Sequence, residues 1–219
     1  MRGPRQKGSD NGGTDARQAI LDAAERIFGM EGYAGAVIRD IADAAGVNLG
    51  LIQYHCGTKD RLFAEAVNRR FAQWETRVVG AVEAAAAAPG ASERDVIRAF
   101  LTPFLEVLAS GDEGWINYLR LLGRGMSAYA MGKVHPALVQ LSDIPDVLKS
   151  NLRAIGGLND DVALDTASYV LEVTLTYLVQ DRGLLTARTH GKVTPAGMAA
   201  ELNFLTDLFA ATFEVRRRA

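Results

Sequence analysis

Apolar residues in the N-terminal part of the chain recur at the spacing of an α-helix. One such stripe, at positions i, i+3, i+4, i+7 and i+8, consists of Ile20, Ala23, Ala24, Ile27 and Phe28. Residues with this spacing lie on one face of a helix and form a buried stripe. Ala and Leu are abundant along the whole chain, and β-branched residues are not clustered. The sequence therefore predicts an all-α fold.

Two short helices are predicted next, over about 37–45 and 49–55, and the turn AAGVN joins them. Gly46 stands where a helix end favours a left-handed residue. Asn48 is a suitable cap for the second helix, and Thr58 for a long helix that follows. Two short helices with a tight glycine turn are typical of a helix-turn-helix unit, across which the first helix is expected to pack.

The chain is predicted to have four parts. Residues 1–13 are rich in glycine and basic side chains and are expected to be a disordered tail. A helix-turn-helix domain over 14–57 is followed by a connecting helix over 58–83. The stretch AAAAAPGA separates it from a second helical domain, 92–219. Within that domain, a helix from Trp115 is expected to weaken at Gly123 and Gly125 and to end near residue 126.

Composition excludes some classes of protein and leaves others open. Hydrophobic residues make up 48% of the 219 residues, which is enough for a sizeable core, and the net charge is -2. Any DNA-binding role must therefore rest on local pattern. The single cysteine permits no intrachain disulfide, which is consistent with a reducing compartment. No apolar run resembles a signal peptide or a membrane span, so we expect a cytoplasmic protein.

The two helices predicted near the C-terminus, over about 162–180 and 196–215, are apolar on more than one side. Helices of this kind are buried on both sides, and in a chain of this size a second subunit is a plausible cover. We therefore hypothesise a homodimer with a two-fold four-helix interface made by these helices.

The stretch AAERIFGMEGYAGAVIRDIADAAGVNLGLIQYHCGTKDRLF, residues 23–63, resembles the N-terminal domain of the tetracycline-repressor (TetR) family. The matching features are the helix end at Phe28, Gly32-Tyr33, Arg39-Asp40-Ile41-Ala42, Ala45-Gly46-Val47, Tyr54-His55 and Gly57-Thr58-Lys59-Asp60. The resemblance implies a two-fold dimer of all-helical subunits. It also implies that the second helix of the unit reads operator DNA, which is released when a small molecule fills a pocket in the C-terminal domain.

The candidate DNA-binding residues follow from this register and are Arg39, Asn48, Leu49, Gly50, Gln53, Tyr54, His55 and Lys59. The N-terminal end of a recognition helix faces base edges, and a glycine there lets the backbone approach the DNA closely. Gln53 is able to pair with adenine or contact a phosphate. Lys59 opens the long helix, where free N–H groups favour an anion. Arg39 has two interpretations, a phosphate contact or an ion pair within the domain.

The chain departs from the family pattern at a few positions. Ala36 and Val37 replace hydroxyl residues that cap the second helix and touch a phosphate in family members, so that contact is in doubt. Leu49 replaces a position that is often polar, which favours contact with a thymine methyl group. Cys56 replaces an aromatic residue that packs in the small core.

The neighbours His55 and Cys56 suggest a catalytic or metal pair. A zinc site needs about four ligands, and the only other histidines are His135 and His190. A nucleophilic cysteine needs a base placed in space, for which adjacency in sequence is no evidence. We favour Cys56 as a small buried hydrophobe and leave a redox-sensing thiol open.

A ligand pocket in the C-terminal domain is predicted among apolar and aromatic residues, namely Phe104, Leu108, Trp115, Tyr118, Leu122, Met126, Tyr129, Tyr169, Val173 and Tyr177. Plain helical core packing is the competing interpretation. The polar groups that would orient a ligand are Asn117, Arg120, Arg124 and Glu172, and structural salt bridges compete for the arginines.

The sequence thus predicts a ligand-responsive DNA-binding transcriptional regulator, a repressor released from a palindromic operator by a small, largely apolar effector. We expect no cofactor, no metal and no enzymatic activity. The alternatives are a helical sensor or enzyme with a vestigial helix-turn-helix, or a structural dimerisation module.

Overall fold

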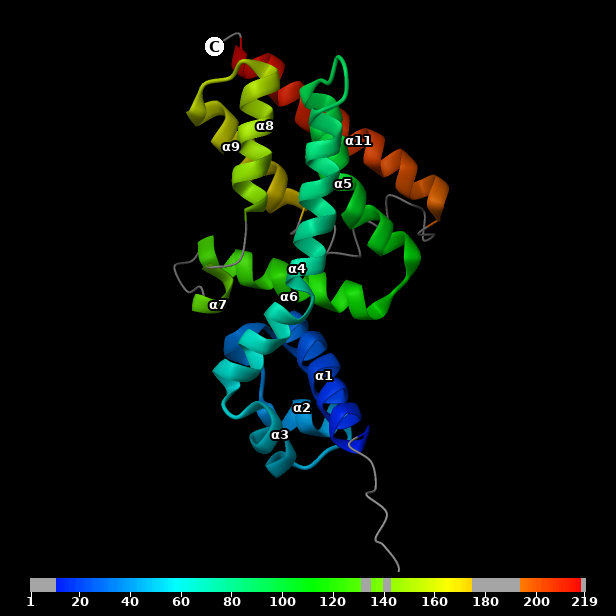
Figure 1. Ribbon diagram of the computed structural model, residues 1–219, viewed down its shortest axis with the longest axis vertical. Helices are drawn as coiled ribbons and strands as arrows, with labels where there is room; N and C mark the ends of the chain where they lie inside the picture. The colour runs from blue at the N-terminus through cyan, green and yellow to red at the C-terminus, as the bar shows by residue number, and fades with distance from the viewer. Residues whose placement is uncertain (1–10, 131–134, 140–142, 175–193, 218–219) are drawn as a thin grey trace, which may run out of the picture.

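The computed structural model describes residues 11–130, 135–139, 143–174 and 194–217, and these form helices without any strand. The elements are α1 (Asn11–Gly35), α2 (Ile38–Ala45), α3 (Leu49–Cys56), α4 (Lys59–Ala86), α5 (Glu93–Ser110), α6 (Glu113–Ala130), α7 (Pro136–Val139), α8 (Ile144–Gly156), α9 (Asp160–Val173) and α11 (Pro195–Arg217). Figure 1 shows α1–α3 gathered at one end and α4 running from them into the other helices. The all-α prediction is confirmed.

We call α1–α3 and the first turns of α4 the head. Its core contains Ile20, Phe28, Ile41, Ile52 and Phe63, all at most 2% exposed. The rings of Phe28 and Phe63 meet edge to face, with centroids 4.9 Å apart. The apolar residues of these helices have helical spacing, so their burial fixes how α1, the two short helices α2 and α3, and α4 cross.

We call α5, α6, α8, α9 and α11 the body, into which the second half of α4 extends (Figure 1). Ser92 caps α5 in a capping box, in which Asp95 bonds back to the Ser92 backbone. Trp74 of α4 meets Phe104 of α5 at 4.8 Å between ring centroids. The body is thus built around a long helix that begins in the head.

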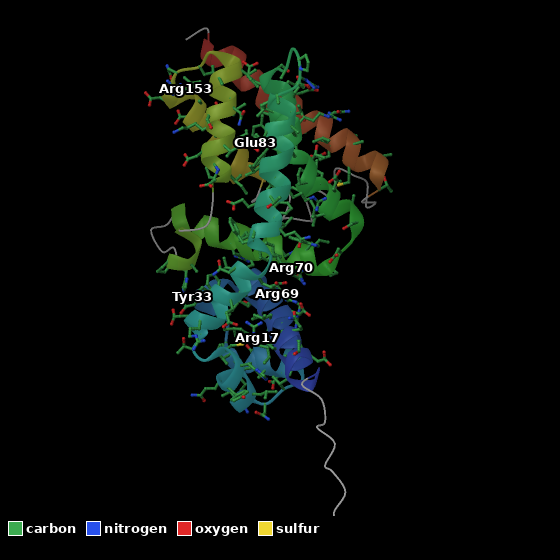
Figure 2. The ribbon with its side chains drawn as sticks, in the orientation of Figure 1. Arg17, Tyr33, Arg69, Arg70, Glu83 and Arg153 are labelled. Carbon is green, nitrogen blue, oxygen red and sulfur yellow. The ribbon has the colours of Figure 1, made fainter. Side chains whose placement is uncertain are left out.

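A buried carboxylate ties α1 to α4 near the junction of head and body. Glu25 is 1% exposed and accepts hydrogen bonds from Arg69 and Arg70, each at 3.2 Å. Burial raises the pKa of Glu25, although both guanidinium groups favour the charged form. Figure 2 labels both arginines close to this junction.

Three features differ from the sequence predictions. The first helix begins at Asn11, inside the segment predicted to be a disordered tail. It bends at Gly32, whose φ of 70° and ψ of 171° are not helical. The helix from Glu113 continues through Gly123 and Gly125 to Ala130, because both glycines are buried and packing offsets their low helix propensity. Among the described residues, no helix has the length and apolar character that crossing a bilayer requires.

Candidate nucleic-acid interface

The turn between α2 and α3 has the geometry that its sequence predicts. Gly46 is left-handed, with φ 67° and ψ 30°, and the N–H of Val47 donates to Ala42 at 3.0 Å. The Asn48 side chain accepts a hydrogen bond from the N–H of Leu51 at 2.9 Å, so it caps α3 as predicted. Ile52 and Cys56 anchor α3 in the head core.

The opposite face of α3 is exposed along its length. Tyr54 is 82% exposed and Leu49 is 54% exposed, and Gly50 and Gln53 are exposed beside them. His55 is half-buried, and its ring meets that of Tyr54 at 5.0 Å between centroids. Large side chains with this much solvent exposure on a short helix are typical of a surface that contacts another molecule.

Gly50 lies on the exposed side of α3, where few atoms surround it. A methyl group added there would meet Asn48 Oδ1 at 3.3 Å and no other described heavy atom beyond its chain neighbours and its own helix backbone within 4 Å. A side chain at this position would therefore crowd only the Asn48 oxygen that caps α3, and no atom of the head core. The lack of a side chain on this outer face allows another molecule to approach the backbone of α3 closely, whereas it contributes nothing to the packing of α3 in the head.

Lys59 stands at the first position of α4, directly beyond α3. Thr58 caps this helix by accepting from the N–H of Arg61 at 3.3 Å. The Lys59 ammonium lies over the ring of Tyr33, with Nζ 4.8 Å from the ring centroid. A lysine at a helix N-terminus adds its charge to the positive end of the helix dipole, which favours an anion there.

The start of α2 lacks a side-chain cap, as the absent hydroxyls predict. Val37 occupies the cap position without a side-chain hydrogen bond, and Ala36 is buried. Arg39 is exposed and makes no ion pair with the described residues. Of its two interpretations, the ion pair within the domain finds no support in the described part of the chain.

Cys56 and His55 do not form a pair. Cys56 is fully buried, and desolvation raises the pKa of its thiol. A thiol in that setting stays protonated and is a poor nucleophile, metal ligand or redox sensor. Over the described residues, no group of three His, Cys, Asp or Glu side chains is placed to hold a metal ion.

The predicted pocket residues that the structure describes are packed against one another. Phe104, Leu108 and Tyr118 are at most 2% exposed and Leu122 is 8% exposed. Trp115 meets Tyr118 at 5.7 Å between ring centroids, and the Tyr118 hydroxyl donates to the backbone oxygen of Val67 at 2.8 Å. These contacts fit the competing interpretation of helical core packing. Tyr177, and the side chains of Met126, Tyr129, Tyr169 and Val173, lie outside the described residues.

The polar groups of α6 face the junction between body and head. Arg120 donates to Asn117 at 3.0 Å, and Arg124 donates to the backbone oxygen of Met30 at 2.9 Å. The side chain of Glu172 is outside the described residues. A hollow of about 570 Å³ lies beside these groups, between α1, α2 and the start of α6, and a second of about 530 Å³ lies between α1 and α4. The first hollow is lined by Gly114 and Asn117, the sequence neighbours of Trp115 and Tyr118, but neither hollow is lined by Phe104, Trp115 or Tyr118 themselves.

Sequence reasoning missed one basic group next to the predicted surface. Arg61 is 70% exposed at its side chain, and its nearest carboxylate, Glu65, is 4.0 Å away. A methyl group added at Gly57 would lie 3.3 Å from Arg61 Nη1, so this guanidinium flanks the end of α3. Its position two residues after Lys59, in the first turn of the same helix, could have predicted that it belongs to this surface.

Comparisons with known proteins agree with this geometry. Residues 20–66, which span most of the head, match the family model described as bacterial regulatory proteins, tetR family. The repressor AcnR of Corynebacterium glutamicum is 44% identical over 50 residues, covering 23% of this chain and 27% of its own length. AcnR of Corynebacterium diphtheriae is 25% identical over 73% of this chain and 76% of its own length. The match to the first of these relatives therefore spans about a quarter of its length.

Solved structures extend the likeness to the body. A TetR-like regulator from Rhodococcus sp. RHA1 superposes with a TM-score of 0.54 at 21% identity, covering 96% of this chain and 99% of its own. The multidrug binding protein EbrR, complexed with malachite green, gives a TM-score of 0.54 at 25% identity, covering 88% and 96%. The fold is that of a helix-turn-helix regulator with a second helical domain. The chain thus resembles the TetR family of bacterial regulatory proteins in sequence over residues 20–66 and in fold over the rest.

Proposed function

We propose that this chain is a cytoplasmic, ligand-responsive transcriptional repressor that binds operator DNA as a homodimer. The exposed face of α3, continued by Lys59 at the start of α4, carries the proposal. It combines an apolar residue, an open glycine, an amide and an exposed aromatic hydroxyl on one short helix. The family model and the AcnR repressors support it, and no observation favours a vestigial helix-turn-helix.

The residues of this face have distinct roles on DNA. Gln53 reads a base edge in the major groove, and Leu49 contacts a thymine methyl group. Tyr54, His55 and Lys59 bind phosphates, which supply affinity without sequence selection. Gly50 lets the helix backbone lie close to the base edges.

A second copy of the chain covers the outer face of α11. Phe204 and Leu208, one turn apart, are 43% and 47% exposed, while Leu205 and Phe209 are buried in the same subunit. The buried side of α11 packs on α5, and at the edge of this contact Arg98 donates to the exposed Asn203 at 2.5 Å. A helix with one buried and one open apolar stripe fits a two-fold helical interface. The interface would involve the segments 162–180 and 196–215.

The effector is a small, largely apolar molecule that binds the body. EbrR is described as a multidrug binding protein and was crystallised with malachite green, which supports this class. Binding would tilt α4 and change the separation of the two recognition helices. Half-sites lie about 34–36 Å apart or at multiples of that distance, so a change of spacing breaks simultaneous contact. The ligand acts only through its different affinities for the two arrangements.

The test is to select duplexes from a random DNA library with the full chain and to footprint the result. The proposal expects a palindromic site with two half-sites, bound by a protein whose mass in solution is twice that of the chain. Leu208→Glu should give monomers that lose the tight complex. Recovery of no preferred sequence, or tight binding by a monomer, would contradict the proposal.

A further inference from the structure

A histidine of the C-terminal part is buried against the head. His135 directly precedes α7 and has a side chain only 12% exposed. Its ring centroid lies 4.8 Å from that of Tyr33 in α1 and 4.6 Å from that of Phe63 in α4. The family match ends at residue 66, so His135 comes from outside the matched segment and contacts two residues inside it.

Hydrogen bonds fix both nitrogens of this ring. The N–H of Ala137 donates to Nδ1 of His135 at 3.1 Å. Because Nδ1 accepts, the ring proton of the neutral form lies on Nε2, which donates to Asp60 Oδ1 at 3.3 Å. The ring is therefore held in one orientation by its own segment on one side and by the head on the other.

Asp60 and Tyr33 connect the histidine to Lys59. The Tyr33 hydroxyl donates to the same Asp60 oxygen at 2.7 Å. The Tyr33 hydrogen bond, and next that of His135, hold the pKa of Asp60 below its usual value. The ring of Tyr33 in turn lies under the Lys59 ammonium, 4.8 Å from Nζ to the centroid. Figure 2 labels Tyr33 at the side of the head that faces α7.

The left-handed bend of α1 makes this arrangement possible. Gly32 has φ 70°, a conformation that disfavours residues with a side chain, and it directly precedes Tyr33. The turn changes the direction of the backbone before Tyr33. The ring of Tyr33 then packs beside that of Phe63, with 5.1 Å between the centroids. We call His135, Tyr33, Asp60 and Lys59 the histidine seat.

We propose that His135 is a positioning residue for the Lys59 contact with DNA phosphate, through Tyr33 and Asp60. The inference rests on the proposed function, in which Lys59 binds a phosphate. His135 itself does not touch DNA. Through Tyr33 and Asp60 it links the C-terminal domain to Lys59, the first residue of α4, so a displacement of His135 alters the phosphate contact while α3 stays in its groove.

A double-mutant cycle on a duplex selected by the full chain tests this directly. His135→Ala should weaken binding about two- to fivefold, the range expected when one exposed cation–π placement is lost. In a Lys59→Ala background the same substitution should change Kd by less than about 1.5-fold, because the group that it positions is gone. The slope of log Kd against log salt should fall in His135→Ala toward that of Lys59→Ala.

Two further variants separate positioning from folding. His135→Phe keeps the ring packing but removes the donor to Asp60, so it should fold normally and give a smaller loss that also vanishes in the Lys59→Ala background. Glu75→Ala is the matched control, since Glu75 accepts the N–H of Asp143 at 3.0 Å in the body, away from the seat. Its effect on Kd should be the same in both backgrounds.

The outcomes are distinct. Equal effects of the His135 substitutions with and without Lys59, at an unchanged salt slope, would overturn the positioning role while leaving the proposed function intact. Failure of the unmodified chain to select or bind any duplex would overturn the proposed function and this inference together.

Discussion

The close contact of α1 with α6 gives a quantitative prediction at Gly29. A methyl group added there would lie 3.1 Å from the carbonyl oxygen of Asn117 and 3.2 Å from the backbone nitrogen of Leu121. Both are backbone atoms of α6, so they cannot rotate out of the way. In contrast, a methyl group added at Gly80 of α4 would meet no described atom within 4 Å, other than its chain neighbours and its own helix backbone.

Both glycines lie inside helices, so replacing either with alanine gains about 0.5–1 kcal/mol of helix stability. At Gly80 nothing opposes this gain, and Gly80→Ala should stabilise the protein by that amount. At Gly29 the gain is set against overpacking of roughly 1–3 kcal/mol. Gly29→Ala should therefore be less stable than Gly80→Ala by about 1–3 kcal/mol, the overpacking cost itself.

Urea unfolding followed by circular dichroism measures this difference, and thermal unfolding should show it as about 2–4 °C per kcal/mol for a chain of this size. Equal stabilisation by Gly29→Ala and Gly80→Ala would refute the reasoning, because it would mean that α6 yields freely to α1. The head would then not be held by the body along this contact.

Further predictions concern individual side chains. Ser92→Ala removes the capping box of α5 and should cost about 1 kcal/mol in the free energy of unfolding, measured by urea titration. Cys56 should react with iodoacetamide in the folded protein at a small fraction of its rate in urea, since burial both shields the thiol and raises its pKa; rapid reaction would show that the head core is open. The pKa of Asp60 is lower folded than unfolded, so its stabilisation is present above the unfolded value and is lost as pH falls through the folded one. The difference in unfolding free energy between the wild type and Asp60→Asn should therefore be constant down to about pH 5 and shrink below it.

Local signals in the sequence were sufficient for the N-terminal caps of α3 and α4. Asn48 and Thr58 cap their helices in the structure as predicted, because each bond joins residues three apart. The absence of a side-chain cap at Val37 was predictable in the same way, because valine has no side-chain group that accepts a hydrogen bond. The continuation of α6 through Gly123 was not predictable in this way, because its cause is packing against another part of the chain.

The DNA-facing set could be assembled from the register of the helix-turn-helix, and the exposure of Leu49 and Tyr54 agrees with it. The histidine seat could not be foreseen. His135 and Asp60 are 75 residues apart in the chain, and no periodicity relates them. A lone histidine before a proline carries no signal until the fold brings it to the head.

The central claim is that Lys59 and the exposed face of α3 bind DNA, and the salt dependence of that binding tests it most directly. The slope of log Kd against log salt, on a duplex selected by the full chain, should be steep for the wild type and lower in magnitude by about 1 per subunit for Lys59→Ala. Lys149→Ala, on α8 of the body, should leave the slope unchanged. A Lys59→Ala slope equal to that of the wild type would contradict the account.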